Sequence, residues 1–330
     1  MQLDLFADGT AFAYNNNDNP FWGSSDFGQT WTPLPLPPSE AGTPEIDFAS
    51  PEFGVVRTGD HLYVTEDKGL TVQRIGSPPV PQRYGAEDRF PSIDTMEVIR
   101  GTETVVLAGD GFWIKDGCPV ETEDGYIWVT EDRGDTWRRV TIPFPSLGHE
   151  IEFLNGRYGL VLLYEMEVTS RSECGYGSTG IRTSVLLTTD GGRSFKEIHS
   201  AYHEDEDTVF SVAMPTPRRI LLGTQGGKIL LSTNQGRSFR KIVHLKNEVD
   251  EETGQDSGFA IDGLVFGTRK IGYAGTNGRG TWRTEDGGAT WSRETSIQSV
   301  AGLNIGDIVA TGPDRALAGG AHAIARRVPI

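Results

Sequence analysis

The sequence predicts an all-β fold, a seven-bladed β-propeller that forms a single domain. Three observations carry this prediction: an eight-residue motif recurs six times, short apolar stretches precede its copies, and 42 glycines with frequent turn clusters accompany them. The chain contains no convincing long amphipathic helical stretch. Short strands separated by regular turn signals are typical of an all-β protein.

The recurring motif begins with Ser or Thr and has Asp or Asn at its third position and Gly at its fifth. It closes with Ser or Thr followed by an aromatic residue or Val. Its third positions are Asp26, Asp67, Asp132, Asp190, Asn234 and Asp286. These positions are separated by 41, 65, 58, 44 and 52 residues. A unit of roughly 40–50 residues, with insertions, is the sequence signature of a propeller blade.

Each part of the motif has a mechanical role in a β-hairpin turn, which we call the clasp. The apolar run before it, as in 126–129, predicts a strand. The Asp or Asn accepts hydrogen bonds from backbone amides, the Gly takes a positive φ without steric cost, and the aromatic residue begins the next strand. Six copies spread along the chain cannot share one active site, so we interpret the six acidic or amide residues as structural.

The strands before each clasp allow the blades to be counted. The segment 45–56 matches 150–161 position for position, and weaker copies of the same two strands lie at 211–222 and 263–274. The last stretch, 307–325, repeats three strands without a clasp. Six blades with clasps and one without give seven. Their approximate ranges are 1–36, 44–77, 92–142, 149–199, 208–244, 260–296 and 303–330.

The clasp resembles the Asp-box, or bacterial neuraminidase repeat, of sialidases, sortilin-type receptors, xyloglucan-degrading enzymes and photosystem II assembly factors. The strings at 272–278 and 284–291 are most similar to the photosystem II assembly-factor-like and sortilin-type propellers. The resemblance covers almost the whole chain and implies the propeller fold, which hosts hydrolases, receptors and assembly factors alike.

Three of the functions in that group fit this sequence poorly. A sialidase would need an arginine cluster that begins near the first blade, but the first arginine is Arg57. The xyloglucan-degrading enzymes resemble two such propellers in tandem, and one is present here. The photosystem assembly factors present arginine-rich patches, from which this acidic chain departs.

The charge and hydropathy pattern narrows the partners. The net charge is −16, from 30 basic and 46 acidic residues. Nucleic acids and anionic membranes need a cationic footprint, so we expect neither as a partner. No run of 18 apolar residues exists, so we expect no membrane insertion, and we expect a monomer. The first residues lack the pattern of a signal peptide.

Two long insertions between the second and third strands of blades three and four locate added function. The two cysteines of the chain, Cys118 and Cys174, lie in these two insertions. A disulfide between them would staple the loops and favour a periplasmic or secreted location; two free thiols are the alternative. The candidate binding residues on this loop-rich face are Phe112, Trp113, Tyr176, Arg182, Arg83 and Tyr84.

The innermost strands carry a second candidate site. Alternate side chains of these strands face the central channel. One such position holds Asp4, Glu45, Thr95, Glu150, Ser211, Gly263 and Asp307; the position two further on holds Phe6, Asp47, Glu97, Glu152, Ala213, Val265 and Val309. Converging carboxylates raise one another's pKa or require a cation. A channel of solvated acids with no further role is the alternative.

These features support two classes of function. The first is a non-catalytic binding or assembly module that presents the face of blades three and four to a protein or glycan partner. The second is a carbohydrate-active enzyme of glycosidase or lyase type, with catalytic carboxylates among Glu45, Asp47, Glu97, Glu150 and Glu152. A metal-dependent enzyme at the same site, or a Ca²⁺ or other divalent cation in the channel, would use ligands from Asp4, Asp47, Glu152, Asp307, His61 and His149.

Overall fold

The computed structural model contains β-strands and turns and no helix in the part of the chain that it describes. The described residues are 2–14, 21–35, 45–59, 61–79, 88–115, 118–142, 146–172, 175–202, 208–245, 260–276, 280–295, 297, 307–320 and 324–327. Within these ranges the side chains of 88–92, 110–115, 118–124, 166–172 and 175–181 are not described. No segment of the described chain forms a helix that could cross a lipid bilayer.

The strands form seven small antiparallel sheets, and each sheet is a meander of strands in chain order. This confirms the prediction of an all-β, seven-bladed β-propeller. The chain divides into two compact units, residues 37–203 and residues 1–36 with 204–330. Each unit contains whole sheets, so the division falls between sheets and not within one.

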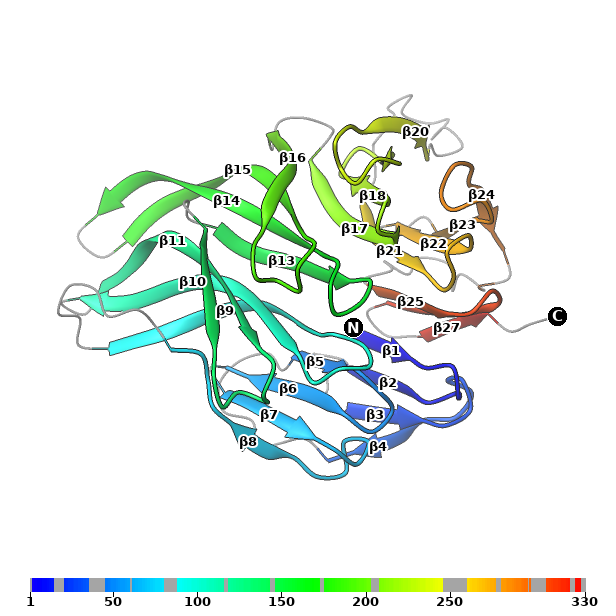
Figure 1. Ribbon diagram of the computed structural model, residues 1–330, viewed down its shortest axis with the longest axis horizontal. Helices are drawn as coiled ribbons and strands as arrows, with labels where there is room; N and C mark the ends of the chain where they lie inside the picture. The colour runs from blue at the N-terminus through cyan, green and yellow to red at the C-terminus, as the bar shows by residue number, and fades with distance from the viewer. Residues whose placement is uncertain are drawn as a thin grey trace. The chain divides into compact units, whose positions relative to one another are not determined.

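The unit formed by residues 37–203 holds sheets two, three and four (Figure 1). The first strands of these sheets, β5, β9 and β13, lie next to one another, and we call them the inner strands. Its strands are β5 (Glu45–Phe48), β6 (Gly54–Thr58), β7 (His61–Thr65), β8 (Gln73–Ile75), β9 (Asp88–Val98), β10 (Val105–Lys115), β11 (Cys118–Thr130), β12 (Arg138–Ile142), β13 (Ser146–Phe153), β14 (Gly159–Ser172), β15 (Gly175–Thr188) and β16 (Lys196–Tyr202).

The other unit holds sheets five, six, seven and one, and its inner strands β17, β21, β25 and β1 follow one another in the same way. Sheet seven has three strands among the described residues, as the sequence predicts for the blade without a clasp. The strands are β17 (Val209–Thr216), β18 (Arg219–Thr224), β19 (Lys228–Ser232), β20 (Arg240–His244), β21 (Ile261–Phe266), β22 (Gly272–Thr276), β23 (Gly280–Thr284), β24 (Ser292–Glu294), β25 (Asp307–Thr311), β26 (Arg315–Gly319), β27 (Ile324–Arg327), β1 (Gln2–Leu5), β2 (Ala11–Tyr14), β3 (Phe21–Ser24) and β4 (Thr32–Leu34).

Each clasp forms the turn between the third and fourth strands of its sheet. In the third clasp, the Asp132 carboxylate accepts hydrogen bonds from the Thr136 N–H (2.9 Å), the Thr136 hydroxyl (2.5 Å) and the Thr130 hydroxyl (2.7 Å). The N–H of Gly134 donates to the Thr130 hydroxyl at 2.9 Å. Arg133 and Gly134 have φ values of 56° and 84°, so the turn needs two consecutive left-handed residues. The sequence predicts the Gly at the second of these positions but not the strained residue before it.

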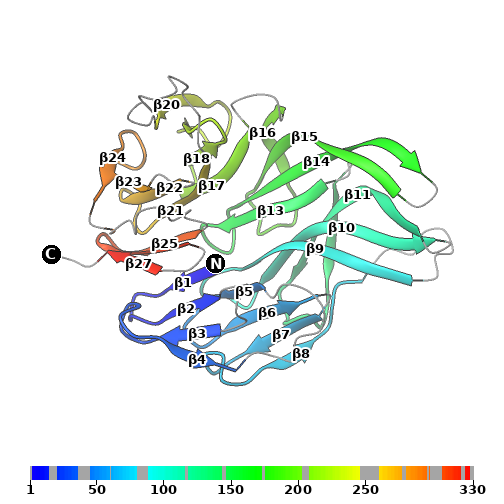
Figure 2. The ribbon, with the colours of Figure 1, turned by 180° about the vertical axis from the view of Figure 1, so that it is seen from behind.

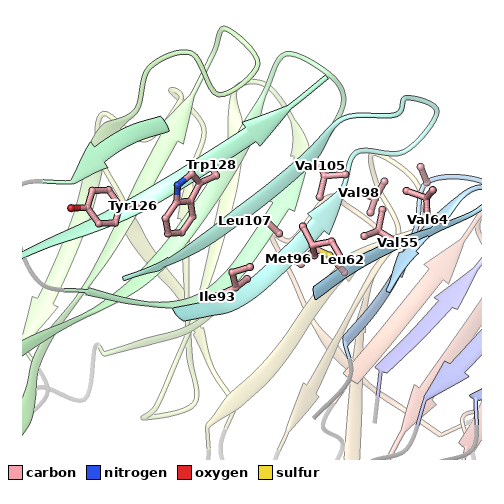
Figure 3. Packing of buried hydrophobic residues seen from close by; sticks show 11 residues of the cluster. Val55, Leu62, Val64, Ile93, Met96, Val98, Val105, Leu107, Tyr126 and Trp128 are labelled. Carbon is pink, nitrogen blue, oxygen red and sulfur yellow. The ribbon is translucent and has the colours of Figure 1, made fainter. Parts of the chain in front are cut away.

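Neighbouring sheets pack face to face through apolar clusters. Figure 3 shows the cluster between sheets two and three, in which Trp128 and Met96 face Leu62 and Val55. Trp128, on the third strand of sheet three, is 0% exposed. A recurring device supports the inner strands: the last inner-strand residue is a Phe whose ring covers a glycine opposite it. The pairs are Phe48 with Gly54, Phe153 with Gly159, and Phe266 with Gly272.

Candidate functional site

The inner strands of the unit formed by residues 37–203 carry the five carboxylates that the sequence analysis proposed as catalytic candidates. Strand pairing places Asp47, Glu97 and Glu152 opposite Val55, Val106 and Leu160, so these three acids hold the same position in their sheets. Glu45 and Glu150 hold the position two residues earlier. This is the register that alternation along the strands predicts.

Two of these carboxylates connect sheet two to sheet three through hydrogen bonds. Glu45 Oε1 accepts a 3.0 Å hydrogen bond from the Met96 N–H, and its Oε2 lies 2.9 Å from Nη2 of Arg57. Asp47 Oδ2 accepts a short hydrogen bond from the Val98 N–H. These amides lie on the edge of β9 that faces away from its partner β10. The two acids therefore supply acceptors that no neighbouring strand provides.

The same device recurs between sheets three and four at a residue that the sequence analysis missed. Asp94 Oδ2 accepts a 3.0 Å hydrogen bond from the Gly148 N–H. An added Cβ at Gly148 would lie 2.8 Å from the carbonyl oxygen of Ala108, so the two sheets approach closely here. Asp94 lies one residue before Thr95 in β9, where a register shift follows Ala108. This register shift, which the alternating pattern of the sequence does not reveal, turns Asp94 toward sheet four.

Asp47 and Glu152 form an electrostatic pair with Arg100. Burial raises the pKa of Asp47 to about 6, although the hydrogen bond from Val98 and the charge of Arg100 oppose the shift. Burial raises the pKa of Glu152 to about 7; Arg100 opposes this rise, and the negative charge of Asp47 adds to it. Both carboxyls thus have pKa values close to neutral pH. Arg100 lies two residues after Val98, the last residue of β9, and the sequence analysis did not single it out.

The other unit contains two of the predicted acids. Asp307 on β25 accepts a 2.7 Å hydrogen bond from the Leu3 N–H on β1. Asp4 is buried, and its pairing with Phe12 places it at the position of Asp47 rather than that of Glu45. The predicted alignment of sheet one was therefore wrong by two residues. Phe6 follows the strand and is buried edge-on against Phe12, with ring centroids 6.3 Å apart, because its apolar ring belongs to the core.

The candidate metal ligands do not gather in the described part of the chain. No group of three His, Cys, Asp or Glu side chains that could hold a metal ion occurs among the described residues. Arg74 Nη2 lies 2.7 Å from Nδ1 of His61. The ring of His149 stacks on that of Tyr164, with centroids 4.4 Å apart.

The two insertions form β-ribbons, not loops. β10 and β11 are 11 and 13 residues long, and β14 and β15 are 14 residues each, whereas β6, β7 and β19 have five. The pairing continues outward to Lys115 with Cys118 and to Ser172 with Gly175. Figures 1 and 2 show the two ribbons running out side by side, and β11 contacts β15. Antiparallel pairing satisfies the backbone polar groups that a long loop would leave to solvent.

Arg182, predicted as a binding residue, lies at the base of the second ribbon and is held by its own sheet. Its Nε lies 2.6 Å from Glu165 Oε1, and its Nη2 lies 3.1 Å from Glu197 Oε2. The Ser184 Oγ lies 2.7 Å from Glu165 Oε1 and 3.0 Å from Glu197 Oε2, so its single proton can be donated to either carboxylate. The hydrogen bond with Glu165 raises the pKa of Arg182, so the guanidinium stays charged. Tyr202, opposite Arg182, is 61% exposed.

The remaining predicted residues lie partly or wholly outside the described structure. The strands place Phe112 opposite Glu121, Trp113 opposite Val120 and Tyr176 opposite Arg171, and the side chains at these positions are not described. Arg83, Tyr84 and Cys174 lie outside the described residues, as does the side chain of Cys118. The predicted disulfide is therefore not addressed by the structure.

Known proteins resemble this chain in fold. No protein-family model matches the chain, and no curated protein matches it. A solved structure of YCF48 bound to D1 peptide is similar over 100% of this chain and 91% of that chain, with 16% identity and a TM-score of 0.66. The WD40 repeats of RRP9 are similar over 98% of this chain and 92% of that chain, with 11% identity and a TM-score of 0.63.

An enzyme also shares this fold. The GH74 enzyme of Niastella koreensis is similar over 99% of this chain and 42% of its own, with 14% identity and a TM-score of 0.54. At these identities the similarity shows the fold alone. The chain therefore belongs to the class of seven-bladed β-propellers.

Proposed function

We propose that this protein is a non-catalytic binding or assembly module of the Asp-box propeller type, and that its partner is a protein. One observation carries the proposal: the second and third strands of two adjacent sheets extend into ribbons of 11 to 14 residues per strand. The second and third strands of the other sheets are short among the described residues. A rigid scaffold with elaborated segments at one end of its sheets is the usual arrangement of a recognition surface.

The described side chains at the base of the second ribbon support this proposal. Tyr202 exposes 61% of its surface beside the charged Arg182, and aromatic residues and arginines dominate the energetics of protein interfaces. The YCF48 structure contains a bound D1 peptide, so a propeller of this fold can bind a peptide. We propose that the ribbon face of this chain binds an extended segment of its partner protein.

A selection from a random-peptide display library tests this function. The full chain is compared with a variant in which two-residue Asn-Gly turns replace 111–124 and 166–181, and the D1 peptide is included as a single probe. We expect the library to yield peptides that bind the full chain and not the variant, while circular dichroism shows that both retain their β-structure. Selected peptides that bind both proteins equally would contradict the proposal.

Two exposed side chains provide a finer comparison. Tyr202 and Leu70 are the large hydrophobic residues that the described surface exposes most, at 61% and 58%. Tyr202 lies at the ribbon end of its sheet, and Leu70 lies in a clasp at the opposite end. Tyr202→Ser should weaken binding of a selected peptide several-fold, and Leu70→Ser should leave it unchanged.

A carbohydrate-active enzyme is the second candidate, and the raised pKa values of Asp47 (about 6) and Glu152 (about 7) favour it. A glycosidase needs one carboxyl protonated near neutral pH and a second ionised. The hydrogen bond from Val98 to Asp47 gives that carboxylate a structural role as well. Release of reducing sugar from a panel of β-glucans, abolished in Glu152→Gln, would support the enzyme; no release from any of them by the parent protein would count against it.

A further inference from the structure

Sheet seven lacks the fourth strand that completes each of the other six sheets in the described structure. In the complete sheets the clasp connects the third strand to the fourth. In sheet seven the third strand is β27, which pairs with β26 on one side. Its other edge is the place where a fourth strand would lie. An open strand edge is a template for pairing with another extended chain.

The complete sheets show what the fourth strand contributes. After three of the clasps, the third residue is apolar and shares a cluster with the clasp aromatic of the next sheet. Ile75 shares an apolar cluster with Trp137, Val140 with Phe195, and Ile242 with Trp291. The indole N–H of Trp137 also donates a 3.0 Å hydrogen bond to the carbonyl of Gly76, which directly follows Ile75.

Trp31 is the clasp aromatic that follows sheet seven. It packs in a cluster with Leu317 and Ile324 of that sheet, and the cluster contains no residue from a fourth strand. Gly134 in the third clasp lies against the fourth strand of the preceding sheet: an added Cβ would lie 2.8 Å from the Gly76 oxygen. At Gly28 of the first clasp, the nearest atoms belong to Leu317 and Trp31 instead. Among the described residues, none accepts a hydrogen bond from the Trp31 indole.

The side chains of β27 define what could bind there. Ala325 and Arg327 face sheet six, where Arg327 Nη1 donates to the Tyr273 hydroxyl at 2.8 Å and lies 3.3 Å from Asp314. Ile324 faces sheet one, so Arg326 shares that face by alternation. No carboxylate of the described residues pairs with Arg326.

The complete sheet two supplies the register. There Leu62 pairs with Ile75 and Val64 pairs with Gln73. Glu45 and Asp307 hold the same position on their inner strands. When the strand pairing is followed outward from these two residues, Leu62 corresponds to Ile324, and Val64 corresponds to Arg326. A fourth strand on β27 would therefore place its apolar residue opposite Ile324. The residue two positions earlier would lie opposite Arg326.

We propose that the edge of β27, with Trp31, is a docking site for an extended segment of a partner protein that adds as a fourth antiparallel strand. The segment carries an acidic residue opposite Arg326 and a β-branched apolar residue two positions later, beneath Trp31. The carbonyl that follows accepts the Trp31 indole N–H. Backbone pairing provides affinity, and the two side-chain positions provide specificity. The chain as a whole is acidic, so the preference for an acidic residue comes from Arg326 itself. Its charge acts only on a residue that lies in direct contact with it.

This site lies in the unit that does not carry the ribbons, so it is independent of the proposed function. The probe is a fluorescein-labelled peptide that copies 71–78 with Gln73→Glu, and binding to the full chain is followed by fluorescence anisotropy. We expect saturable binding that Arg326→Glu weakens at least tenfold. A peptide with Gln73→Lys should bind the Arg326→Glu variant better than the parent protein, and Trp31→Phe, which keeps a ring but loses the N–H, should weaken binding several-fold.

Arg240→Glu is the matched control, since Arg240 is an exposed arginine on the fourth strand of the complete sheet five, and it should leave binding unchanged. Hydrogen exchange at 324–327 locates the peptide, because strand addition should slow exchange there. Equal effects of Arg326→Glu and Arg240→Glu, or unchanged exchange at saturating peptide, would overturn the proposal. Slow exchange at 324–327 before peptide is added would mean that this chain's own residues already cover the edge. A dimer in sedimentation that Arg326→Glu dissociates would mean that a second copy of the chain covers it.

Discussion

The carboxylate of Asp307 accepts a 2.7 Å hydrogen bond from the backbone N–H of Leu3, which lies 304 residues earlier in the chain. Glu45 and Asp47 bind the amides of Met96 and Val98 in the same way. The inner strand of a blade has an edge without a partner strand, and an acid on the neighbouring inner strand satisfies it. Acidic residues on inner strands therefore have a structural reason to be present before any catalytic one.

The first prediction concerns this contact. Asp307→Ala removes the acceptor for the Leu3 amide and should lower the free energy of unfolding by about 1.5–3 kcal/mol, the range for hydrogen bonds to charged groups. Asp307→Asn keeps an acceptor oxygen and should cost less. Urea unfolding of the three proteins measures both effects. If Asp307→Ala unfolds at the same urea concentration as the parent, the contact between sheets seven and one does not support the fold.

The second prediction concerns the glycines beneath the inner-strand phenylalanines. A Cβ at Gly159 would lie 2.7 Å from the ring of Phe153, so Gly159→Ala must displace the ring. Overpacking of this kind typically costs about 1–3 kcal/mol. Gly156→Ala, where the nearest atom lies at 3.8 Å, is the matched control and should be close to neutral. Thermal unfolding distinguishes the two, and equal melting temperatures would show that the ring position is not constrained.

The sequence predicted the sheets well because turn chemistry and alternation are local properties. The clasps and the unclasped seventh blade follow from residues that lie close together in the chain. The partner of Asp94 in the neighbouring sheet could not be predicted, because it depends on a register shift. The partners of Arg182 within its own sheet could not be predicted either, because they depend on how three strands pair. The insertions were expected as loops, since the sequence of a long hairpin carries no signal for its outward pairing. Arg100 lies outside the alternating pattern, so its position beside Asp47 and Glu152 required the structure.

The third prediction concerns Arg182. This arginine neutralises Glu165, which is buried, and it also pairs with Glu197. Arg182→Ala leaves the buried carboxylate without its cation and should cost about 2–4 kcal/mol. Arg193 pairs with Glu131 at 3.2 Å on the surface, so Arg193→Ala should cost less than about 1 kcal/mol. Urea unfolding compares the two variants, and equal costs would mean that the Arg182 network is no stronger than a surface pair.

The fourth prediction concerns the pH dependence of stability at Asp47 and Glu152, whose pKa values are raised to about 6 and about 7. In the unfolded chain both groups lose their protons near pH 4, so between about pH 4 and pH 8 the folded protein binds more protons than the unfolded one. Stability contributed by these groups must therefore fall as the pH rises through that window. Because both side chains are half-buried and partly solvated, we expect a combined loss of about 1–2 kcal/mol between pH 5 and pH 8.

The variant with both Asp47→Asn and Glu152→Gln should lose this slope and should equal or exceed the parent in stability at pH 8, since neither amide ionises. Asp190→Asn is the control: hydrogen bonds from Ser194 hold the pKa of Asp190 at about 2, so that carboxylate stays ionised throughout the window and its replacement should leave the slope intact. Urea unfolding at half-unit steps from pH 5 to pH 8 measures all three proteins. A double variant with the slope of the parent would show that Asp47 and Glu152 are ionised at pH 5. The raised pKa values, and with them the case for acid–base chemistry at this pair, would then fail.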